Sequence, residues 1–115
     1  MNKSAVLNIP RCPVDFAFKR IGGKYKARVL WSLRNEVLRY GELKRAISDI
    51  TPKMLTQVLH ELETDDLVSR ESFVELPPRV EYTLTESGRQ LIPTITLLAL
   101  WGKDQMDIQG LKVSD

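Results

Sequence analysis

The chain has 115 residues, 43% of them hydrophobic and 28% charged, so it is long enough for one domain with one core and too short for two. Its net charge of +2 is unevenly spread: residues 11–45 hold ten Lys and Arg against three acidic residues, whereas residues 46–115 hold six against twelve. A basic half suits an anionic partner such as nucleic acid, although both halves could equally be ordinary solvated surface.

The single cysteine excludes an internal disulfide and fits a reducing, cytoplasmic location. The most apolar stretch, residues 91–102, falls well short of the roughly 20 residues that a membrane helix needs, so no membrane partner is expected.

Residues 1–10 lack a periodic pattern and are expected to form an N-terminal arm. The first predicted helix covers about residues 11–21, because Pro13 suits the first turn of a helix and Gly22-Gly23 would end it. Four apolar residues are expected to be buried by this helix: Val14, Ala17, Phe18 and Ile21.

Two further helices are predicted over residues 24–34 and 40–47. In the first, Tyr25, Val29, Leu30 and Leu33 recur at helical spacing on one face. In the second, Leu43 and Ile47 are expected to point inward, and the basic pair Lys44-Arg45 outward.

The helix with the clearest sequence signals covers about residues 51–65. Thr51 is a good N-cap, and Pro52 then occupies the first helical position. An apolar stripe runs along one face: Leu55, Val58, Leu59 and Leu62. The opposite face presents polar residues suited to reading bases: Lys53, Thr56, Gln57 and His60.

Two strands, residues 67–70 and 80–84, are predicted to follow and to enclose a hairpin, or wing, at about residues 71–80. Pro77-Pro78 marks the hairpin tip, because proline cannot donate a hydrogen bond within a sheet. Arg79 is expected to point outward from this tip toward a DNA groove or phosphate, with Arg70 as a second candidate. Both could instead be solvated arginines.

A long final helix is predicted over residues 85–107, capped by Thr85. It carries more apolar surface than one core-facing stripe requires, which favours a homodimer interface, although the same residues could simply close the core of one chain. With the first helix, the expected interface residues are Val14, Phe18, Leu91, Ile95, Leu98 and Trp101.

The order of elements predicts a mostly helical α+β protein: a winged helix-turn-helix with a two-stranded wing and a long C-terminal dimerisation helix. In this arrangement one helix enters the major groove of duplex DNA while the wing reaches the flanking backbone. Gln can pair with adenine, Thr can contact bases, and Lys can reach guanine or phosphate. The expected DNA-binding residues are Lys44, Arg45, Lys53, Thr56, Gln57, His60, Arg70 and Arg79; the alternative is an ordinary polar face.

The sequence offers little for catalysis or metal binding. His60 and Cys12 are the only residues of their types, and no glycine-rich phosphate loop is present, so neither an enzyme nor a metal or other cofactor is expected. Cys12 is a candidate redox sensor, because a helix start and the adjacent Arg11 both favour a thiolate. The alternative is a buried, unreactive thiol.

Four segments together resemble the HxlR-type winged helix-turn-helix transcriptional regulators of bacteria, relatives of the MarR-like regulators. The segments are CPVDFAFKRIGGKYKARVLWSL, YGELKRAISDITPKMLTQVLHELETDDLVSR, PPRVEYTLTESGRQLIP and the closing LWG. The resemblance implies a dimeric DNA-binding regulator whose first and last helices make the dimer, and some relatives respond to oxidants or electrophiles through a cysteine at the place of Cys12.

The chain departs from the family pattern at several positions. Val58 and His60 stand where relatives often have arginines, Asp66 stands in place of a glycine, and Tyr25 in place of a Trp. Fewer cations on the reading helix should weaken attraction to phosphates. The alternative function is therefore a winged-helix protein-interaction module with weak or lost DNA binding.

Overall fold

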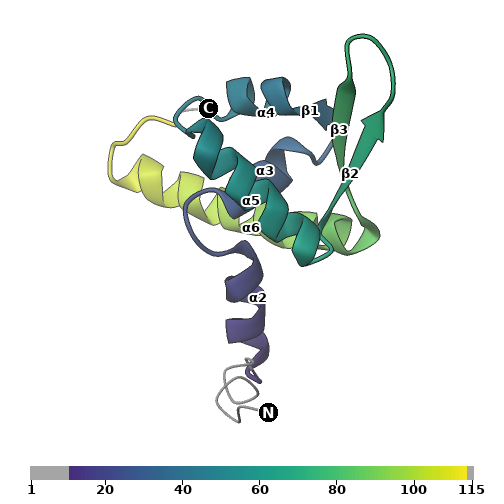
Figure 1. Cartoon of the computed structure of the whole chain (residues 1–115). Coiled ribbons are helices and arrows are strands. Elements are labelled where there is room, and N and C mark those ends of the chain that lie inside the picture. Colours follow the sequence, from purple (N-terminus) through teal and green to yellow (C-terminus); the bar gives the residue numbers. More distant parts are fainter. Residues whose placement is uncertain (1–10, 114–115) are drawn as a thin grey trace.

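The computed structural model describes residues 11–113, so the expected N-terminal arm, residues 1–10, lies outside the described residues. Five helices and three strands follow one another (Figure 1): α2 Pro13–Ile21, α3 Lys26–Ser32, β1 Leu38–Arg39, α4 Tyr40–Ala46, α5 Pro52–Thr64, β2 Val68–Phe73, β3 Arg79–Leu84 and α6 Glu86–Ile108. The predicted mostly helical α+β winged helix-turn-helix is confirmed: α4, α5 and the β2–β3 hairpin occur in the predicted order.

The core is organised around α3, which contacts α2, α4, α5 and α6. Val29 and Leu30 of α3 are fully buried, and Leu43 of α4 is also fully buried against them. The predicted apolar stripe of α5 completes this core, since all four of its residues are at most 4% exposed. The opposite side of α5 is consequently turned to solvent.

Both ends of α5 follow from the sequence signals. The side chain of Thr51 accepts a hydrogen bond from the backbone N–H of Met54 at 3.1 Å, and Pro52 is the first helical residue. The helix ends at Thr64 with Asp65 as its C-cap, and Asp66 takes a left-handed conformation with φ of 58°. Asp tolerates this conformation better than most residues other than glycine, which explains how it can stand where the resembling sequences have glycine.

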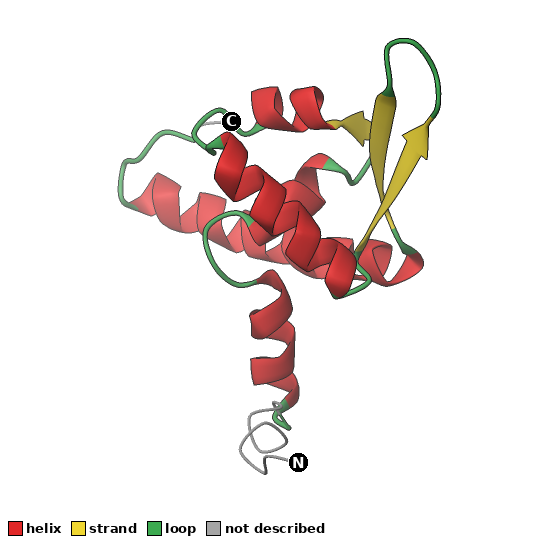
Figure 2. Ribbon diagram, in the orientation of Figure 1, coloured by secondary structure: helices red, strands yellow, loops and turns green. Residues whose placement is uncertain are grey.

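The hairpin belongs to a three-stranded antiparallel sheet of order β1-β3-β2. The prediction included only two strands; it missed β1, where Leu38 pairs with Tyr82, and it ended the first hairpin strand at Arg70 instead of Phe73. A two-residue strand cannot show the alternation by which strands are identified in a sequence. The β2–β3 hairpin projects from the body of the molecule (Figure 2).

The prediction that the first helix buries its apolar residues is wrong for most of them. Val14 and Phe18 are 60% and 55% exposed rather than buried, and only Ile21 of α2 enters the core. Figure 1 shows the reason, because α2 projects away from the other helices. Gly22 ends α2 as predicted; an added Cβ there would collide with the carbonyl oxygen of Phe18.

The last helix is attached to the core through its first half. Thr85 caps it by accepting a hydrogen bond from the N–H of Gly88 at 3.0 Å, and the same hydroxyl donates to the carbonyl of Asp66 at 2.7 Å. Ile95 is buried, whereas five large apolar residues of the second half are exposed: Leu97, Leu98, Leu100, Trp101 and Ile108. Among the helices within residues 11–113, none combines the length and apolar character that crossing a membrane requires.

Replacement of Leu30 by Ala should lower the free energy of unfolding by about 2–5 kcal/mol, because it leaves a cavity in a fully buried position at the centre of the core. The matched control is Val74→Ala at the exposed hairpin tip, which should change stability by less than about 0.5 kcal/mol. Urea unfolding of both variants at one protein concentration measures the difference, and equal losses would contradict this account of the core.

Candidate nucleic-acid interface

The outer face of α5 gathers the four polar residues singled out in the sequence. Lys53, Thr56, Gln57 and His60 are all exposed, and their spacing of three and four residues places them on one side of the helix. Lys53 is the only Lys or Arg in α5, while Glu61 and Glu63 are acidic. This face therefore offers hydrogen-bonding groups more than positive charge.

A tyrosine that sequence reasoning missed ties this face to α4. The hydroxyl of Tyr40, the first residue of α4, donates to the carbonyl of Pro52 at 2.9 Å and lies 3.3 Å from the hydroxyl of Thr56. Glu42 accepts a bond from the backbone N–H of Arg39 at 2.8 Å, which stabilises the start of α4. Tyr40 thus fixes the first turns of α5 against α4. Its spacing from Pro52 gives no helical signal, so only the tertiary structure reveals it.

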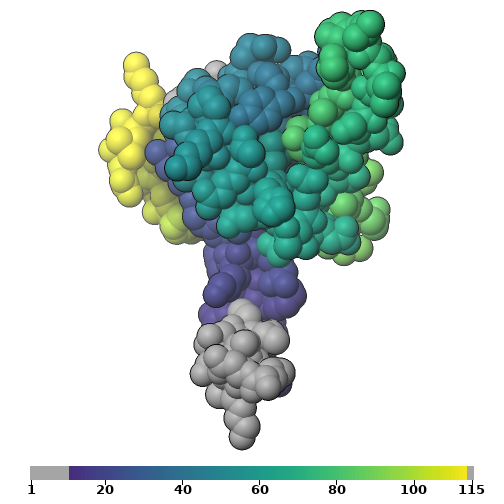
Figure 3. All heavy atoms as spheres, viewed as in Figure 1, coloured from purple at the N-terminus to yellow at the C-terminus, as the bar shows by residue number. Residues whose placement is uncertain are grey.

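A groove runs between α5 and the sheet and brings three of the expected residues together. Thr56 and His60 line it from α5, and Arg70 lines it from β2. Its volume is about 380 Å³, and the other lining residues are Tyr40, Leu59, Glu63 and Tyr82. In the view of Figure 3, α5 and the hairpin lie on the same face of the molecule. Of the α4 pair, Lys44 is half-buried and Arg45 is exposed.

The wing arginine is not free, contrary to the expectation that Arg79 points outward. Its guanidinium lies 3.3 Å from a carboxylate oxygen of Glu75 and 3.3 Å from one of Glu81, and 4.2 Å from the centre of the Phe73 ring. The strand register explains this arrangement, because Phe73 is the direct cross-strand partner of Arg79, and Glu81 lies two residues along β3 on the same face. The hairpin tip beyond it exposes the apolar side chains of Val74 and Leu76.

The turn between α4 and α5 is bound to α3 through Asp49. Arg28 of α3 donates two hydrogen bonds to the Asp49 carboxylate, at 2.8 and 3.1 Å, and the Lys24 ammonium lies 3.6 Å from it. The hydroxyl of Tyr25 donates to the Asp49 carbonyl at 3.3 Å. The hydrogen bonds from Arg28 are the main reason why the pKa of Asp49 is lowered to about 2. Sequence reasoning missed this pair, whose members lie 21 residues apart.

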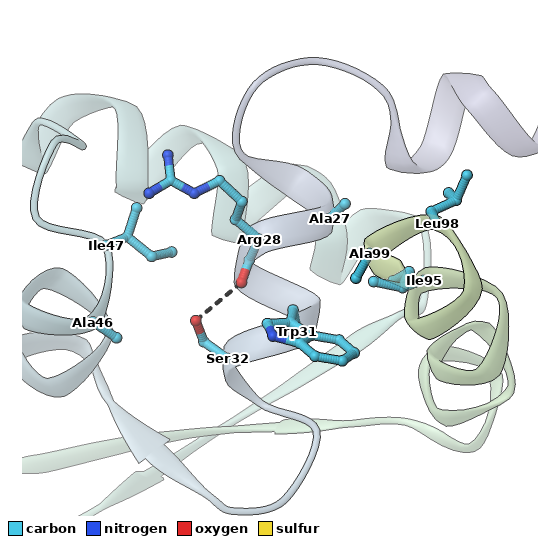
Figure 4. Close-up of a pocket in the computed structure, with 9 residues that line it drawn as sticks. All are labelled: Ala27, Arg28, Trp31, Ser32, Ala46, Ile47, Ile95, Leu98 and Ala99. Carbon is cyan, nitrogen blue, oxygen red and sulfur yellow. Dashed lines mark hydrogen bonds between the residues drawn. The ribbon is translucent and has the colours of Figure 1, made fainter. Parts of the chain in front are cut away.

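A second, apolar pocket of about 400 Å³ opens on α3 between α4 and α6 (Figure 4). Trp31 and Arg28 line it from α3, and Ile95 and Leu98 line it from α6. The hydroxyl of Ser32 donates its proton to the carbonyl of Arg28 at 3.0 Å, so toward a ligand it can act only as an acceptor. None of the pocket's lining residues belongs to α5, and Arg28 also bonds Asp49 in the turn before that helix.

The remaining candidates lie on α2 and α6. Cys12 is exposed at the N-cap of α2, so its own chain does not bury the thiol. Of the expected interface residues, Val14, Phe18, Leu98 and Trp101 are exposed. Two others differ: Leu91 is half-buried against the core, and Ile95 is only 6% exposed, so its own chain leaves it almost no surface for a partner. Within residues 11–113, no group of three or more His, Cys, Asp or Glu could hold a metal ion.

Comparison with known proteins points to one family. The family model for the HxlR-like helix-turn-helix matches residues 20–109. An uncharacterized HTH-type transcriptional regulator from Methanothermobacter thermautotrophicus is 49% identical over 92 residues, which cover 80% of this chain and 70% of that protein.

Solved structures agree with this assignment. The redox regulator HypR in its oxidized form is 42% identical with a TM-score of 0.78, and the match covers 81% of this chain and 96% of that one. The reduced form of the transcriptional regulator YodB from B. subtilis is 32% identical with a TM-score of 0.71, covering 80% and 91%.

The Arg28–Asp49 pair predicts a pH-dependent contribution to stability. A carboxylate whose pKa is lower in the folded chain stabilises the fold above its unfolded pKa, and this effect is lost as pH falls through the folded value. The difference in Tm between wild type and Asp49→Asn should therefore stay constant from about pH 8 to 5 and shrink between about pH 4 and 2. Arg28→Gln should reproduce this dependence, and a pH-independent difference for both variants would contradict it.

Proposed function

This chain belongs to the HxlR-like helix-turn-helix family of transcriptional regulators, and we propose that it is a cytoplasmic, homodimeric regulator that binds duplex DNA through α5 in the major groove. The observation that carries the proposal is the outer face of α5. Its four exposed polar residues lie on the side opposite a fully buried stripe, and Tyr40 bonds the same helix to α4.

In this proposal the exposed residues of α5 make different kinds of contact with DNA. Gln57 and Thr56 contact base edges, since an amide can pair bidentately with adenine and a Thr methyl can touch thymine. Lys53 reaches guanine or phosphate, and His60 faces the groove beside Arg70. The binding mode relies on hydrogen bonding, because α5 has one Lys and no Arg.

Phosphate contacts then come from the elements that flank α5. Lys44 and Arg45 of α4 and Arg70 of β2 are the proposed cations. In this proposal Arg79 supports the wing, since its ion pairs with Glu75 and Glu81 hold the hairpin in shape. The wing would approach DNA with the apolar tip around Leu76.

The proposed dimer uses the exposed apolar surfaces of α2 and α6. Large apolar residues in contiguous exposed positions mark interaction surfaces. On α2 these are Val14 and Phe18, and on the second half of α6 they are Leu98 and Trp101. Burial of these faces against a second copy would also explain why α2 projects from the body of its own chain (Figure 1).

We also propose that Cys12 makes DNA binding sensitive to oxidants or electrophiles. Its thiol is exposed at the N-cap of α2, directly after Arg11 in the sequence, so an oxidant or electrophile can reach it from solvent. The similar protein HypR is named a redox regulator, which supports this proposal. Since α2 belongs to the proposed dimer surface, modification of Cys12 would alter how two subunits are arranged.

Binding to duplex DNA should depend steeply on salt, with log K falling by about 0.9 per phosphate contact per unit of log salt. Lys53→Ala should reduce this slope by about 0.9 if Lys53 contacts a phosphate, whereas Gln57→Ala should lose on the order of 1–3 kcal/mol of discrimination between sequences. Fluorescence anisotropy on duplexes selected from random sequence with the wild-type protein measures both effects, with Lys112→Ala as control. A wild-type slope near zero would reject DNA binding and favour the protein-interaction module.

Leu98→Glu should convert the dimer to monomers, because a charge buried in an apolar interface without a partner is strongly unfavourable. Val74→Glu adds the same charge at the hairpin tip and should leave the dimer intact. Sedimentation equilibrium at micromolar concentration distinguishes the two. A wild-type protein that is monomeric under these conditions would contradict the proposed interface.

Mild oxidation should weaken DNA binding of the wild-type protein by at least about tenfold, and dithiothreitol should restore it, because one Cys per chain allows only reversible first products such as a sulfenic acid or a disulfide. Cys12→Ser should bind DNA equally well with and without oxidant. If the product is a bond between two Cys12 residues, their α-carbons must come within about 7 Å in the dimer. Unchanged affinity of the oxidised wild-type protein would exclude the sensor role.

A further inference from the structure

The turn that leads into α5 is held by side chains from a distant part of the sequence. Asp49 receives two hydrogen bonds from Arg28, at 2.8 and 3.1 Å, and its carboxylate also lies 3.6 Å from the Lys24 ammonium. Tyr25 donates to the Asp49 carbonyl at 3.3 Å. Both the side chain and the backbone of Asp49 are thus bound to the N-terminal part of α3 and the residues before it.

Neighbouring residues restrict the same turn from the other side. Ile47 and Ile50 flank Asp49 and are each 1% exposed, so they anchor the turn in the core. Thr51, two residues after Asp49, is the N-cap of α5. Figure 4 shows the Arg28 side chain reaching from α3 toward Ile47. Asp49 therefore lies in a turn that is held on both sides, two residues before the N-cap of α5.

We infer that Arg28 and Asp49 are positioning residues for DNA recognition: their paired hydrogen bonds hold the first turn of α5, and with it Lys53 and Gln57, at the position required for the major groove. This inference rests on the proposed function and adds to it two residues that do not themselves contact bases. A bidentate Arg–carboxylate pair fixes direction as well as distance, which a single point charge cannot do.

The pair adds a small, pH-dependent contribution to stability, and its geometric role is the larger one. The side chains of Arg28 and Asp49 are 38% and 44% exposed, and exposed ion pairs contribute little to global stability. An acidic residue beside a surface that binds a polyanion also opposes binding through its charge. The cations Arg28 and Lys24 offset that charge, so the pair can act as a support at small electrostatic cost.

These opposing effects allow a decisive test with Asp49→Asn. Loss of a negative charge alone would strengthen binding to every DNA. Loss of positioning should instead weaken binding to a duplex selected from random sequence by the wild-type protein, by about tenfold, which is within the range of coupling between contacting groups. Binding to poly(dI-dC), which needs no exact placement of α5, should stay equal or become tighter. The control is Glu61→Gln, which removes a charge from α5 itself and should not weaken binding to either DNA.

A double-mutant cycle separates the pair from its individual charges. Arg28→Gln should weaken binding to the selected duplex as Asp49→Asn does, and the double variant should be no weaker than either single variant. Arg28→Lys keeps the cation without the bidentate geometry and should fall between wild type and Arg28→Gln. Thermal unfolding confirms that each variant is folded at the temperature of the binding assay.

Amide hydrogen exchange provides a readout that does not involve DNA. In Asp49→Asn the N–H of Met54, which is bonded to Thr51, should exchange faster, while the N–H of Leu30 in α3 should be unchanged. Unchanged exchange at Met54, or binding of the selected duplex by Asp49→Asn as tight as wild type, would overturn the positioning role while leaving the proposed function intact. Failure of the wild-type protein to bind any duplex would instead overturn the proposed function and this inference together.

Discussion

The burial of α5 against α3 is the interaction on which the rest of the structure depends. Leu55 and Leu59 pack into a core that includes the fully buried Val29 and Leu30, and a helix whose one side is committed in this way must turn its other side to solvent. The outer face of α5 is therefore a consequence of core packing. The Tyr40 hydroxyl and the Arg28–Asp49 pair then restrict how α5 can slide or rotate on that core.

The parts of this arrangement that could be predicted from the sequence are those encoded locally. Thr51 and Pro52 indicate the start of α5, because they are residues typical of an N-cap and a first helical position. The spacing of the apolar residues of α5 predicts which of its two faces is buried. Gly22 and Thr85 act in the same way at the end of α2 and the start of α6.

Two kinds of feature could not be predicted from the sequence. One is a contact between residues distant in sequence, and the other is whether an apolar face is buried by its own chain. Arg28 and Asp49 meet only after folding, and the sequence shows the charge of Arg79 but not the strand register that directs it onto Phe73 and Glu81. Periodicity identifies the apolar face of α2 but does not say whether its own chain buries it, and the exposure of Phe18 shows that its own chain does not. The proposed reading and dimerisation surfaces thus lie on different elements that share α3 as their common support.

In the proposed complex, the outer face of α5 contacts DNA while the apolar face of α6 contacts a second copy of the chain. Photocrosslinking with benzophenone side chains tests both halves in one experiment, by introducing the probe at position 57 in one variant and at position 101 in another. The probe at position 57 should link the protein to duplex DNA, and the probe at position 101 should link two protein chains. Links to DNA from position 101 and to protein from position 57 would contradict this arrangement.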